Sequence, residues 1–400
     1  MSGLISVDDA LMAIRNNRPP LQTETIPIEA SLRRRLAAPV IARRTHPPAA
    51  MSAMDGYAVK LADVSRANAR LHVVGEAPAG RPFEGIVGAG EAVRIFTGSV
   101  IPRGSDHVII QENTERDGDT LISLQEYDAP AHIRAAGLDF SENETLITAG
   151  TQLSPEHLSL VAAGNNSAVE VERKLRVGLL SNGDELRAPG SELLPGEIIN
   201  SNPYGLTGLI ERWGGEAVNL GIAPDNQAAI GKTIAQAEDV DVFVPIGGAS
   251  VGDHDHMRAA FAARNFTPVF EKIAVRPGKP TWFSKSPEAL VLGLPGNPAS
   301  SLVCAHLFLA PLLGDDWQHR LIRGSLLSDV SSNGPREHFM RARAELDSNG
   351  QITINPAPSQ DSSLLRPFLS CNVLLRRLPD AAAVNAGENV EALAIGPLLQ

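Results

Sequence analysis

From Leu175 onwards, short apolar strand-like runs alternate with glycine-bearing loops and amphipathic helical runs. The series reads LRVGLL, NPYGLTGLIERWG, EAVNLGI, DNQAAIGKTIAQAED, VDVFVPI, DHMRAAFAAR, ALVLGL and NPASSLVCAHLFLAPLLG. This alternation is typical of βαβ units, because parallel strands need a crossover connection between them. We therefore predict a multidomain α/β plus β chain in which residues 173–325 form an α/β domain with a mostly parallel sheet.

The rest of the 400-residue chain has a different pattern, and its length favours two to four domains of roughly 150 residues each. Residues 51–145 contain short alternating runs separated by Gly, Pro and Asp-Gly, which predict a small inserted β-rich domain. Residues 1–50 with 146–172 would form a mixed α/β linker domain around it. Residues 326–400 are predicted to be a C-terminal β domain with a hairpin turn at Asn349–Gly350.

Composition excludes several classes of function. The formal charge is −11 and aromatic residues make up 4% of the chain, which argues against a nucleic-acid partner. The two cysteines, Cys304 and Cys371, are too few for a disulfide framework and are predicted to be buried apolar residues. The most apolar stretch, residues 302–313, is short and the N-terminal sequence has no secretory pattern. We therefore expect a cytoplasmic protein with no membrane partner.

Three unusual loops follow predicted strands of the α/β domain. They are SNGDEL at 181–186, GGASVGD at 247–253 and LPGNPASS at 294–301. Because parallel strands end on one edge of the sheet, these loops should converge there. Their small residues allow a ligand to approach the backbone, and the third loop leads into a helix N-terminus, which favours an anion. Together they predict a site for a phosphate-bearing ligand.

Charged residues are also expected near this edge. Lys272, Arg276 and Lys279 surround a rigid Pro-Gly turn that would hold their charges in place as an anion clamp. A divalent metal that bridges carboxylates and an anionic ligand would suit such a crevice. The carboxylates predicted at the same edge are Asp184, Glu185, Asp225 and Asp255.

Three other patterns suggest a hydrolase, a phosphate loop or a metal site, but the sequence evidence for each is weaker. Ser250 satisfies G-x-S-x-G, but partner His and Asp residues in the required order are not evident, so a hydrolase is disfavoured. Gly231–Thr233 resembles the end of a phosphate loop, yet its stretch reads as an amphipathic helix. The run Asp253–His256 cannot supply four ligands to one ion, because adjacent residues do not all face it.

Motifs in a fixed order along essentially the whole chain resemble the molybdopterin molybdenumtransferases, relatives of the gephyrin E domain. The resemblance implies an elongated homodimer of four-domain chains with a C-terminal β barrel, in which the α/β cleft of one subunit faces the inserted β domain of the other. The motifs are SAMDGYAV at 52–59, RIFTGSVIPRGSDHVIIQE at 94–112, the segment 137–150, SNGDEL, GGASVGDHD, VRPGKP and GLPGNPAS.

The activity that the resemblance implies is insertion of molybdate into adenylylated molybdopterin, with release of AMP and with Mg²⁺ or a similar ion. Molybdate and the phosphorylated ligand are both anions, so their charge must be neutralised locally. Two alternatives are a divergent paralogue or scaffold that binds molybdopterin without turnover, and a molybdopterin adenylyltransferase. The second alternative would not require the MDGYA arm or the C-terminal β domain.

The resemblance also assigns residue roles. Asp55, Thr97 and Asp139 would be catalytic residues that reach the site from the second subunit. Asp184, Glu185 and Asp225 would hold the metal or order the attacking water, and Asp255 would be a further catalytic carboxylate. The ligand-binding positions implied in the α/β loops are Ser181, Gly183, Gly247, Gly248, Ser250, Pro295, Gly296, Asn297, Pro298 and Ser300. The basic and C-terminal positions are Lys272, Arg276, Lys279, Arg336, Arg341 and Ser363.

The chain departs from the family pattern at a few positions. Asn182 replaces a usual Thr, Arg276 replaces a usual Lys, and Asn143 replaces a usual Gly that Asn can mimic at positive φ. Residues 49–51 are Ala-Ala-Met where Asp-Asn is common. No acidic or basic role is deleted, so we expect an active enzyme.

Overall fold

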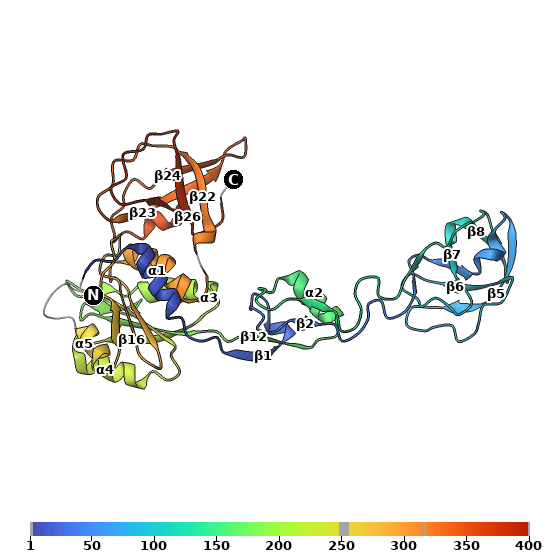
Figure 1. Cartoon of the computed structure of the whole chain (residues 1–400), viewed down its shortest axis with the longest axis horizontal. Helices are drawn as coiled ribbons and strands as arrows, with labels where there is room; N and C mark the ends of the chain where they lie inside the picture. The colour runs from blue at the N-terminus through green and yellow to red at the C-terminus, as the bar shows by residue number, and fades with distance from the viewer. Residues whose placement is uncertain (1–2, 248–255, 316, 399–400) are drawn as a thin grey trace. The chain divides into compact units, whose positions relative to one another are not determined.

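The computed structural model describes residues 3–247, 256–315 and 317–398, and the chain divides into two compact units (Figure 1). The first unit contains residues 1–21 and 174–400, and the second contains residues 22–173. Within the described ranges, no helix has both the length and the apolar character needed to cross a membrane.

The first unit contains the predicted α/β sheet, of six strands in the order β16-β13-β17-β21-β20-β18. The first four strands are parallel, and β20 and β18 are added at one edge through antiparallel pairings, so the mostly parallel sheet is confirmed. The strands are β13 (Arg176–Asn182), β16 (Glu216–Ala223), β17 (Val242–Ile246), β18 (Thr267–Phe270), β20 (Trp282–Lys285) and β21 (Leu290–Gly293). The short strands β14 (Leu186–Arg187) and β15 (Ile198–Ile199) pair in a separate excursion after β13.

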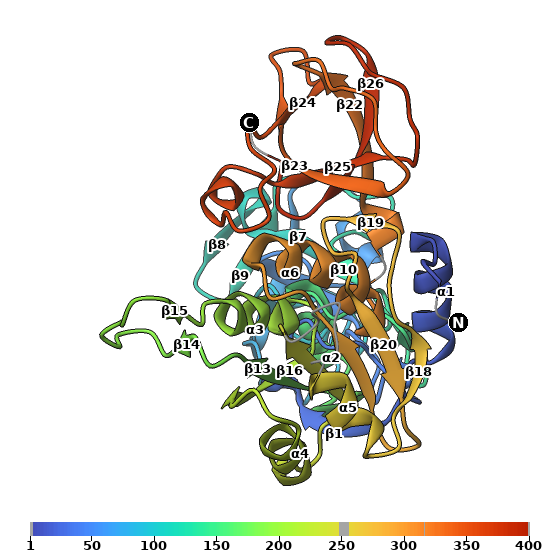
Figure 2. The same ribbon diagram turned by 90° about the vertical axis from the view of Figure 1, so that its left-hand side faces the viewer.

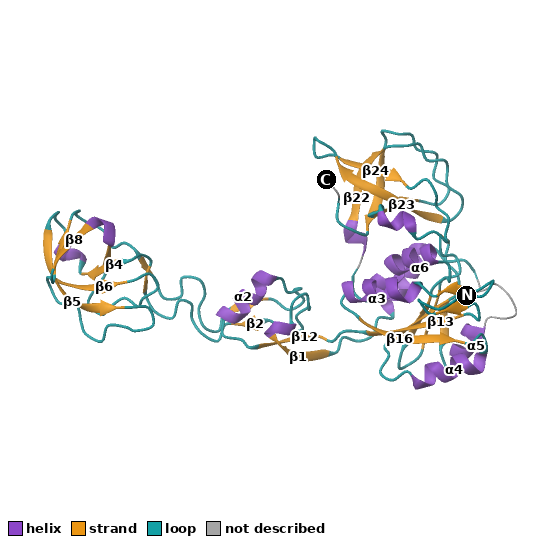
Figure 3. Cartoon of the chain, turned by 180° about the vertical axis from the view of Figure 1, so that it is seen from behind, coloured by secondary structure: helices purple, strands orange, loops and turns teal. Residues whose placement is uncertain are grey.

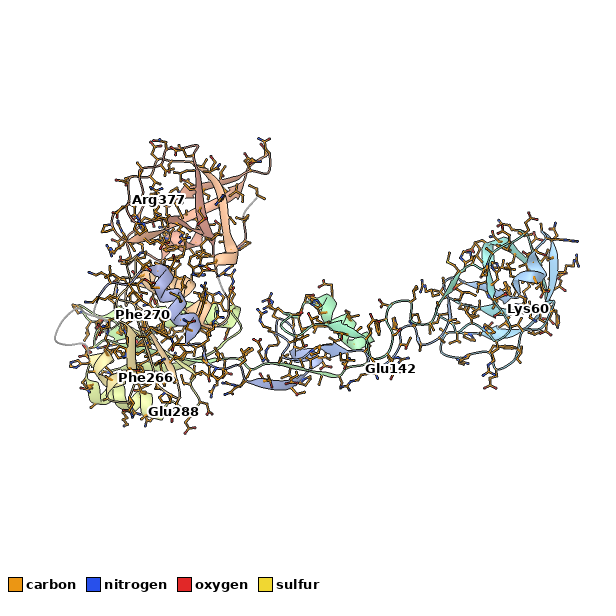
Figure 4. The ribbon with its side chains drawn as sticks, in the orientation of Figure 1. Lys60, Glu142, Phe266, Phe270, Glu288 and Arg377 are labelled. Carbon is orange, nitrogen blue, oxygen red and sulfur yellow. The ribbon has the colours of Figure 1, made fainter. Side chains whose placement is uncertain are left out.

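Side chains that alternate along the strands build a core on each face of this sheet. Phe270 belongs to the core under α1, α3 and α6, whereas Phe266 belongs to the core under α4 and α5 (Figures 1 and 4). Because both faces are covered by helices, the central strands are apolar almost throughout. The helices are α1 (Val7–Asn16), α3 (Asn202–Arg212), α4 (Gln227–Gln236), α5 (His256–Ala262) and α6 (Pro298–Cys304). Gly231–Thr233 lies within α4, which confirms that it is not a phosphate loop.

The position of α1 differs from the predicted assignment of residues 1–50 to the linker domain. Its apolar stripe, which includes Leu11 and Ile14, is fully buried in the α/β core. Ile5 also pairs with Ile273 and donates its amide hydrogen to the carbonyl of Lys272. The helix periodicity showed which face would be buried, but not against which sheet.

The helix that follows the LPGNPASS loop continues through a π-helical segment. Segment η4 (Ala305–Leu309) joins α6 to α7 (Ala310–Leu312), and His306 in this segment is 4% exposed. The ring of His306 meets that of Trp213 edge-on at 5.2 Å. Burial, followed by the positive charges of Arg320 and Arg212, lowers the pKa of His306 to about 3.

Acid should therefore destabilise this unit. Neutral His306 contributes stability above its ordinary pKa of 6.5, and that contribution is lost as the pH falls toward about 3, because only the unfolded chain accepts the proton readily. We expect the melting temperature to fall over this range in thermal unfolding scans. His306→Leu should flatten the fall, whereas an identical pH profile in this variant would contradict the assignment.

The C-terminal strands close into a five-stranded barrel in the order β23-β24-β22-β26-β25, with β25 pairing back onto β23 (Figure 2). Gly350 has φ 75° in the predicted turn between β23 and β24, so the Asn349–Gly350 hairpin is confirmed. The barrel begins at Leu321, ahead of the boundary predicted at residue 326. Its strands are β22 (Leu321–Leu326), β23 (Glu337–Leu346), β24 (Ile352–Pro356), β25 (Val373–Arg377) and β26 (Asn389–Ala394).

The second unit contains a six-stranded sheet in the order β7-β4-β6-β5-β9-β8, inside the segment predicted to be β-rich. The flanking segments form three two-stranded pairs, β1–β12, β2–β11 and β3–β10, together with helix α2 (Figure 3). Asn143 has φ 69°, as its replacement of a glycine predicted. The sheet strands are β4 (Gly56–Val59), β5 (Ala69–Ala77), β6 (Glu91–Ile95), β7 (His107–Ile110), β8 (Thr114–Asp117) and β9 (Thr120–Ser123). The other elements are β1 (Thr23–Pro27), β2 (Val40–Ile41), β3 (Met51–Ser52), β10 (Ile133–Arg134), β11 (Thr145–Ile147), α2 (Pro155–Ala163) and β12 (Ala168–Glu172).

Candidate functional site

The loops that follow β13 and β16 are tied together at the carboxyl edge of the sheet. The amide of Asp225 donates a hydrogen bond of 3.1 Å to Oδ1 of Asp184. Asn182 is buried, and its side-chain amide points to the carbonyls of Ala223 and Pro224, each at 3.4 Å. The residue that departs from the family pattern therefore joins the SNGDEL loop to the segment that leads to Asp225.

The loops that follow β17 and β21 meet at the same edge. The amide of Gly247 donates to the carbonyl of Leu294, and a Cβ placed on Gly247 would lie 3.2 Å from the carbonyl oxygen of Asn182 and 3.9 Å from Cα of Gly296. The predicted convergence of the three loops is thus confirmed for the part of each loop that the structure describes. The predicted residues Gly248, Ser250 and Asp255 lie outside the described residues.

Other hydrogen bonds stabilise the predicted loops and the strand ends that carry them. The hydroxyl of Ser181 is buried and exchanges hydrogen bonds with the side chain of Asn200, so it braces the strand end. Asn202 Nδ2 donates to the carbonyl of Gly296 at 2.8 Å. Neither Asn200 nor Asn202 was predicted to belong to the site, although both lie in the polar sequence INSNPYG at the start of α3. The buried residues at these strand ends also include Gly183 and Pro295, whereas Pro298 is half-buried as the first residue of α6.

Asp184, Glu185 and Asp225 are all exposed at this edge. Among the described residues, however, no three His, Cys, Asp or Glu side chains lie close enough together to hold a metal ion. Carboxylate oxygens are nevertheless the donors that Mg²⁺ prefers, and Mg²⁺ commonly uses one or two of them together with water and phosphate oxygens. The donor set therefore fits Mg²⁺ bound jointly by protein and ligand, rather than in a cage made by the protein alone.

The Arg276–Lys279 turn packs against helix α6. A Cβ placed on Gly278, whose φ is 113°, would lie 2.0 Å from Sγ of Cys304. This thiol accepts a hydrogen bond from Thr281 Oγ1 at 3.2 Å, and its burial raises its pKa to about 12. The predicted burial of Cys304 is confirmed, and the turn is held against the helix that carries Ser300 one turn earlier.

The two cations of this turn are exposed, whereas the residues beside them are at least partly buried. Arg276 and Lys279 both present their side chains to solvent. Lys272 is half-buried, and Ser300 is 4% exposed. A rigid turn that carries two exposed cations is suited to an anion, because the backbone geometry is fixed before the ligand arrives.

A loop of the C-terminal barrel reaches the start of α6. Ser362 accepts at its carbonyl from the amide of Ala299 at 2.9 Å, and Asn297 Nδ2 donates to its hydroxyl at 3.0 Å. Ser363 donates from both its amide and its hydroxyl to Oδ1 of Asp361, and these bonds lower the pKa of Asp361. The predicted Ser363 is thus brought to the LPGNPASS loop, and Ser362 is a contact that the sequence did not reveal.

Arg341 holds this loop in place. It is 2% exposed, and its guanidinium donates to the carbonyls of Leu364 at 2.6 Å, Asp361 at 2.8 Å and Ser359 at 3.2 Å. These bonds make Arg341 a positioning residue for the Ser362–Ser363 segment. Arg336 directly precedes β23, and its Nη1 lies 3.5 Å from the carbonyl of Val275.

In the second unit, the structure brings two of the three predicted residues together. Thr97 donates to Oδ1 of Asp55 from its amide at 2.7 Å and from its hydroxyl at 2.8 Å. These two bonds, with a smaller contribution from the charge of Arg94, lower the pKa of Asp55, which is fully exposed. Asp139 is also exposed, but its amide bonds to the carbonyl of His46 and no contact joins it to Asp55 among the contacts described.

The remainder of the MDGYA motif has a packing role. A Cβ placed on Gly56 would lie 1.8 Å from the carbonyl oxygen of Ile109, so only glycine fits where β4 pairs with β7. The ring of Tyr57 lies 5.0 Å below the guanidinium of Arg94, which also donates to the carbonyl of Gly56. The motif therefore places the exposed carboxylate of Asp55 directly before the tightly packed strand β4.

Loops that meet at the edge of a parallel sheet, with cations and carboxylates around them, are an arrangement suited to an anionic ligand. Three family models match the chain: MoeA N-terminal region (domain I and II) at 5–164, probable molybdopterin binding domain at 183–315, and MoeA C-terminal region (domain IV) at 323–395. The chain belongs to the molybdopterin molybdenumtransferase family. It is accordingly a transferase with a role in molybdenum cofactor biosynthesis.

Individual relatives agree with this assignment. The chain is 33% identical to the molybdopterin molybdenumtransferase of Haemophilus influenzae, over 97% of this chain and 98% of that protein. It is 35% identical to the enzyme of that name from a Nostoc species, over 84% and 81% respectively. A crystal structure of the molybdopterin biosynthesis MoeA protein from Pyrococcus horikoshii is similar, with a TM-score of 0.85 and 27% identity over 99% of this chain and 100% of that chain.

Proposed function

We propose that this chain inserts molybdate into adenylylated molybdopterin and releases AMP. The observation that carries the proposal is the meeting of Gly247 with the SNGDEL and LPGNPASS loops, at an edge where a rigid turn supplies two exposed cations. Both substrates are anions, and bringing them together requires positive charge that is already in position. The names of the curated relatives support the same reaction class.

Arg276, Lys279 and Ser300 are our candidates for holding molybdate or phosphate. The two cations are exposed on a turn that packs against Cys304. They can therefore contact a ligand while the turn keeps its packing. Ser363, brought to the LPGNPASS loop by Ser362, would add a hydroxyl from the barrel. Arg341 would act through that loop and would not touch the ligand.

Release of AMP by hydrolysis adds water across the phosphoanhydride bond, so one oxygen–phosphorus bond forms and the bond to the leaving phosphate breaks. Glu185 and Asp184 are exposed carboxylates beside the converging loops and would orient that water. Asp184, Glu185 and Asp225 would hold Mg²⁺, which would neutralise phosphate charge when bound. Asp255 would be a further carboxylate of this group.

Purified protein supplied with adenylylated molybdopterin, molybdate and Mg²⁺ should release AMP, measured by chromatography. Removal of Mg²⁺ by a chelator should stop release, and Glu185→Gln should slow it about a hundredfold, the size typical of a displaced catalytic carboxylate. Glu288→Gln changes an exposed carboxylate elsewhere in the unit and should have no effect (Figure 4). Absence of AMP would contradict the proposed enzyme, and formation of adenylylated molybdopterin from MgATP would instead indicate the adenylyltransferase.

We further propose a homodimer in which Asp55, Thr97 and Asp139 of one subunit complete the site of the other. The support is that two hydrogen bonds from Thr97 hold the exposed carboxylate of Asp55 in a defined position. Both cysteines are free, which fits a reducing cytoplasm as the location.

A shared site predicts complementation between inactive variants. Asp55→Asn and Glu185→Gln chains mixed by unfolding and refolding should recover about a quarter of wild-type activity, because half the dimers are mixed and each has one intact site. The AMP assay measures recovery, and light scattering measures the dimer. A monomeric protein, or a mixture no more active than its components, would refute the shared site.

A further inference from the structure

One row of side chains at the end of the C-terminal barrel contains two arginines and a histidine. Arg276, on β19 (Val275–Arg276), pairs in register with His338 of β23. His338 in turn pairs with Arg377 of β25. Residues directly opposite each other on neighbouring strands project to the same face, so these three side chains form one row across three strands.

The alternation of side chains shows which face this is. Met340 and Ala342, at the same parity as His338, belong to the interior core of the barrel. Val275 has the opposite parity and lies in the α/β core, as does Phe339. The row therefore faces the end of the barrel interior, away from the α/β core.

Arg377 is buried in this row but incompletely bonded. It is 6% exposed, and its guanidinium donates to the carbonyl of Ala382 (Figure 4 labels Arg377 on the barrel). Its Nε is buried and has no hydrogen-bond partner within the described part of the chain. A buried guanidinium N–H without a partner is costly, which points to a group that would complete it.

Charge in this region is also unbalanced. Among the residues that the structure describes, none of Arg276, Arg336 and Arg377 forms an ion pair with a carboxylate. His338 is 7% exposed, and burial followed by the charges of Arg276, Arg336, Arg341 and Arg377 lowers its pKa to about 4. Neighbouring Arg376, in contrast, is paired with Glu337 at 2.5 Å.

We propose that Arg377, His338 and Arg276 form a binding site for a tetrahedral oxyanion at this end of the barrel. The assignment of the anion to molybdate or to a substrate phosphate rests on the proposed function, whereas the site itself does not. Arg276 belongs both to this row and to the Arg276–Lys279 turn, so the site extends the proposed anion clamp onto the barrel. Neutral His338 can take part because one ring N–H donates without a charge.

Sulfate is a suitable probe because its charge does not change over the pH range of interest. Isothermal titration calorimetry of the full chain should show binding that Arg377→Leu weakens about tenfold or more, as expected for one charge-assisted hydrogen bond. Arg343→Leu is the matched control, since Arg343 is on β23 but pairs with Glu345. Equal sulfate affinity in wild type and Arg377→Leu would overturn the site.

A second measurement does not depend on the folding of a variant. Nuclear magnetic resonance of wild-type protein labelled at histidine should show that saturating sulfate raises the pKa of His338, because an adjacent anion favours the imidazolium form. The signal is assigned by its loss in His338→Gln. A pKa of His338 that sulfate leaves unchanged would overturn the site.

Competition distinguishes the two sources of the anion. Displacement of sulfate by molybdate alone would assign molybdate, and displacement by AMP alone would assign a phosphate of the substrate. Displacement by neither would overturn the link with the proposed reaction. Because sulfate binding is measured without turnover, a failure of AMP release and a failure of this site are seen separately.

Discussion

Replacing Arg276 and Lys279 together by alanine should lower kcat/KM for AMP release about a thousandfold, because each charge-assisted contact contributes about 1.5–3 kcal/mol. Both side chains are exposed, and the turn that carries them is fixed by Gly278 and Cys304. The variant should therefore keep the melting temperature of the wild type. Steady-state kinetics over a molybdate series, together with thermal unfolding, measure the two quantities.

Lys285→Ala is the matched control for this double variant. Lys285 is an exposed cation of the same unit, and its ammonium group bonds only to Asn17 in the contacts described. Its removal should leave kcat/KM unchanged, as an exposed contact far from the loops contributes little. Wild-type kinetics in the double variant would remove these two residues from the site, and a large loss in the control would show that only net charge matters.

Gly278→Ala should destabilise the first unit by about 3–5 kcal/mol, because overpacking and a positive φ each cost a non-glycine residue 1–3 kcal/mol. The added Cβ would lie 2.0 Å from Cys304 Sγ, in a position where φ is 113°. Chemical denaturation followed by intrinsic fluorescence measures the change.

Two variants separate the steric and conformational parts of this cost. Gly387→Ala places an alanine at φ 91° with no atom within 4 Å, so only the conformational cost should appear. Cys304→Ala removes the obstructing sulfur and should restore much of the stability in the Gly278→Ala background. If Cys304→Ala gave no relief, the clash would not be the cause of the instability.

The sequence predicted the α/β sheet and the meeting of its loops, because strand–helix alternation and the direction of parallel strands are local rules with a fixed spatial outcome. It could not predict Ser362 at the start of α6, or His338 and Arg377 beside Arg276. These contacts depend on how the barrel packs against the sheet, and no periodicity encodes that packing. The placement of α1 was wrong for the same reason.

The hydrogen-bond partners of individual residues in the candidate site could not be predicted from the sequence either. The resemblance implies that Arg341 binds ligand, and the structure shows that it is buried and donates to three backbone carbonyls. Asn182 was identified only as a departure from the family pattern, whereas its amide joins neighbouring loops. Arginine and asparagine donate equally well to ligands and to backbone carbonyls, so residue type alone could not decide between them.

The strand that contains Val275 and Arg276 has a consequence for any attempt to divide the protein. Val275 is buried in the α/β core, while both residues pair with β23 of the barrel. A fragment that ends before the barrel would keep the Arg276–Lys279 turn in its sequence but lose the strand beside it. The barrel is thus not a detachable module, and chimaeras that exchange it between relatives would exchange one wall of the proposed anion-binding region as well.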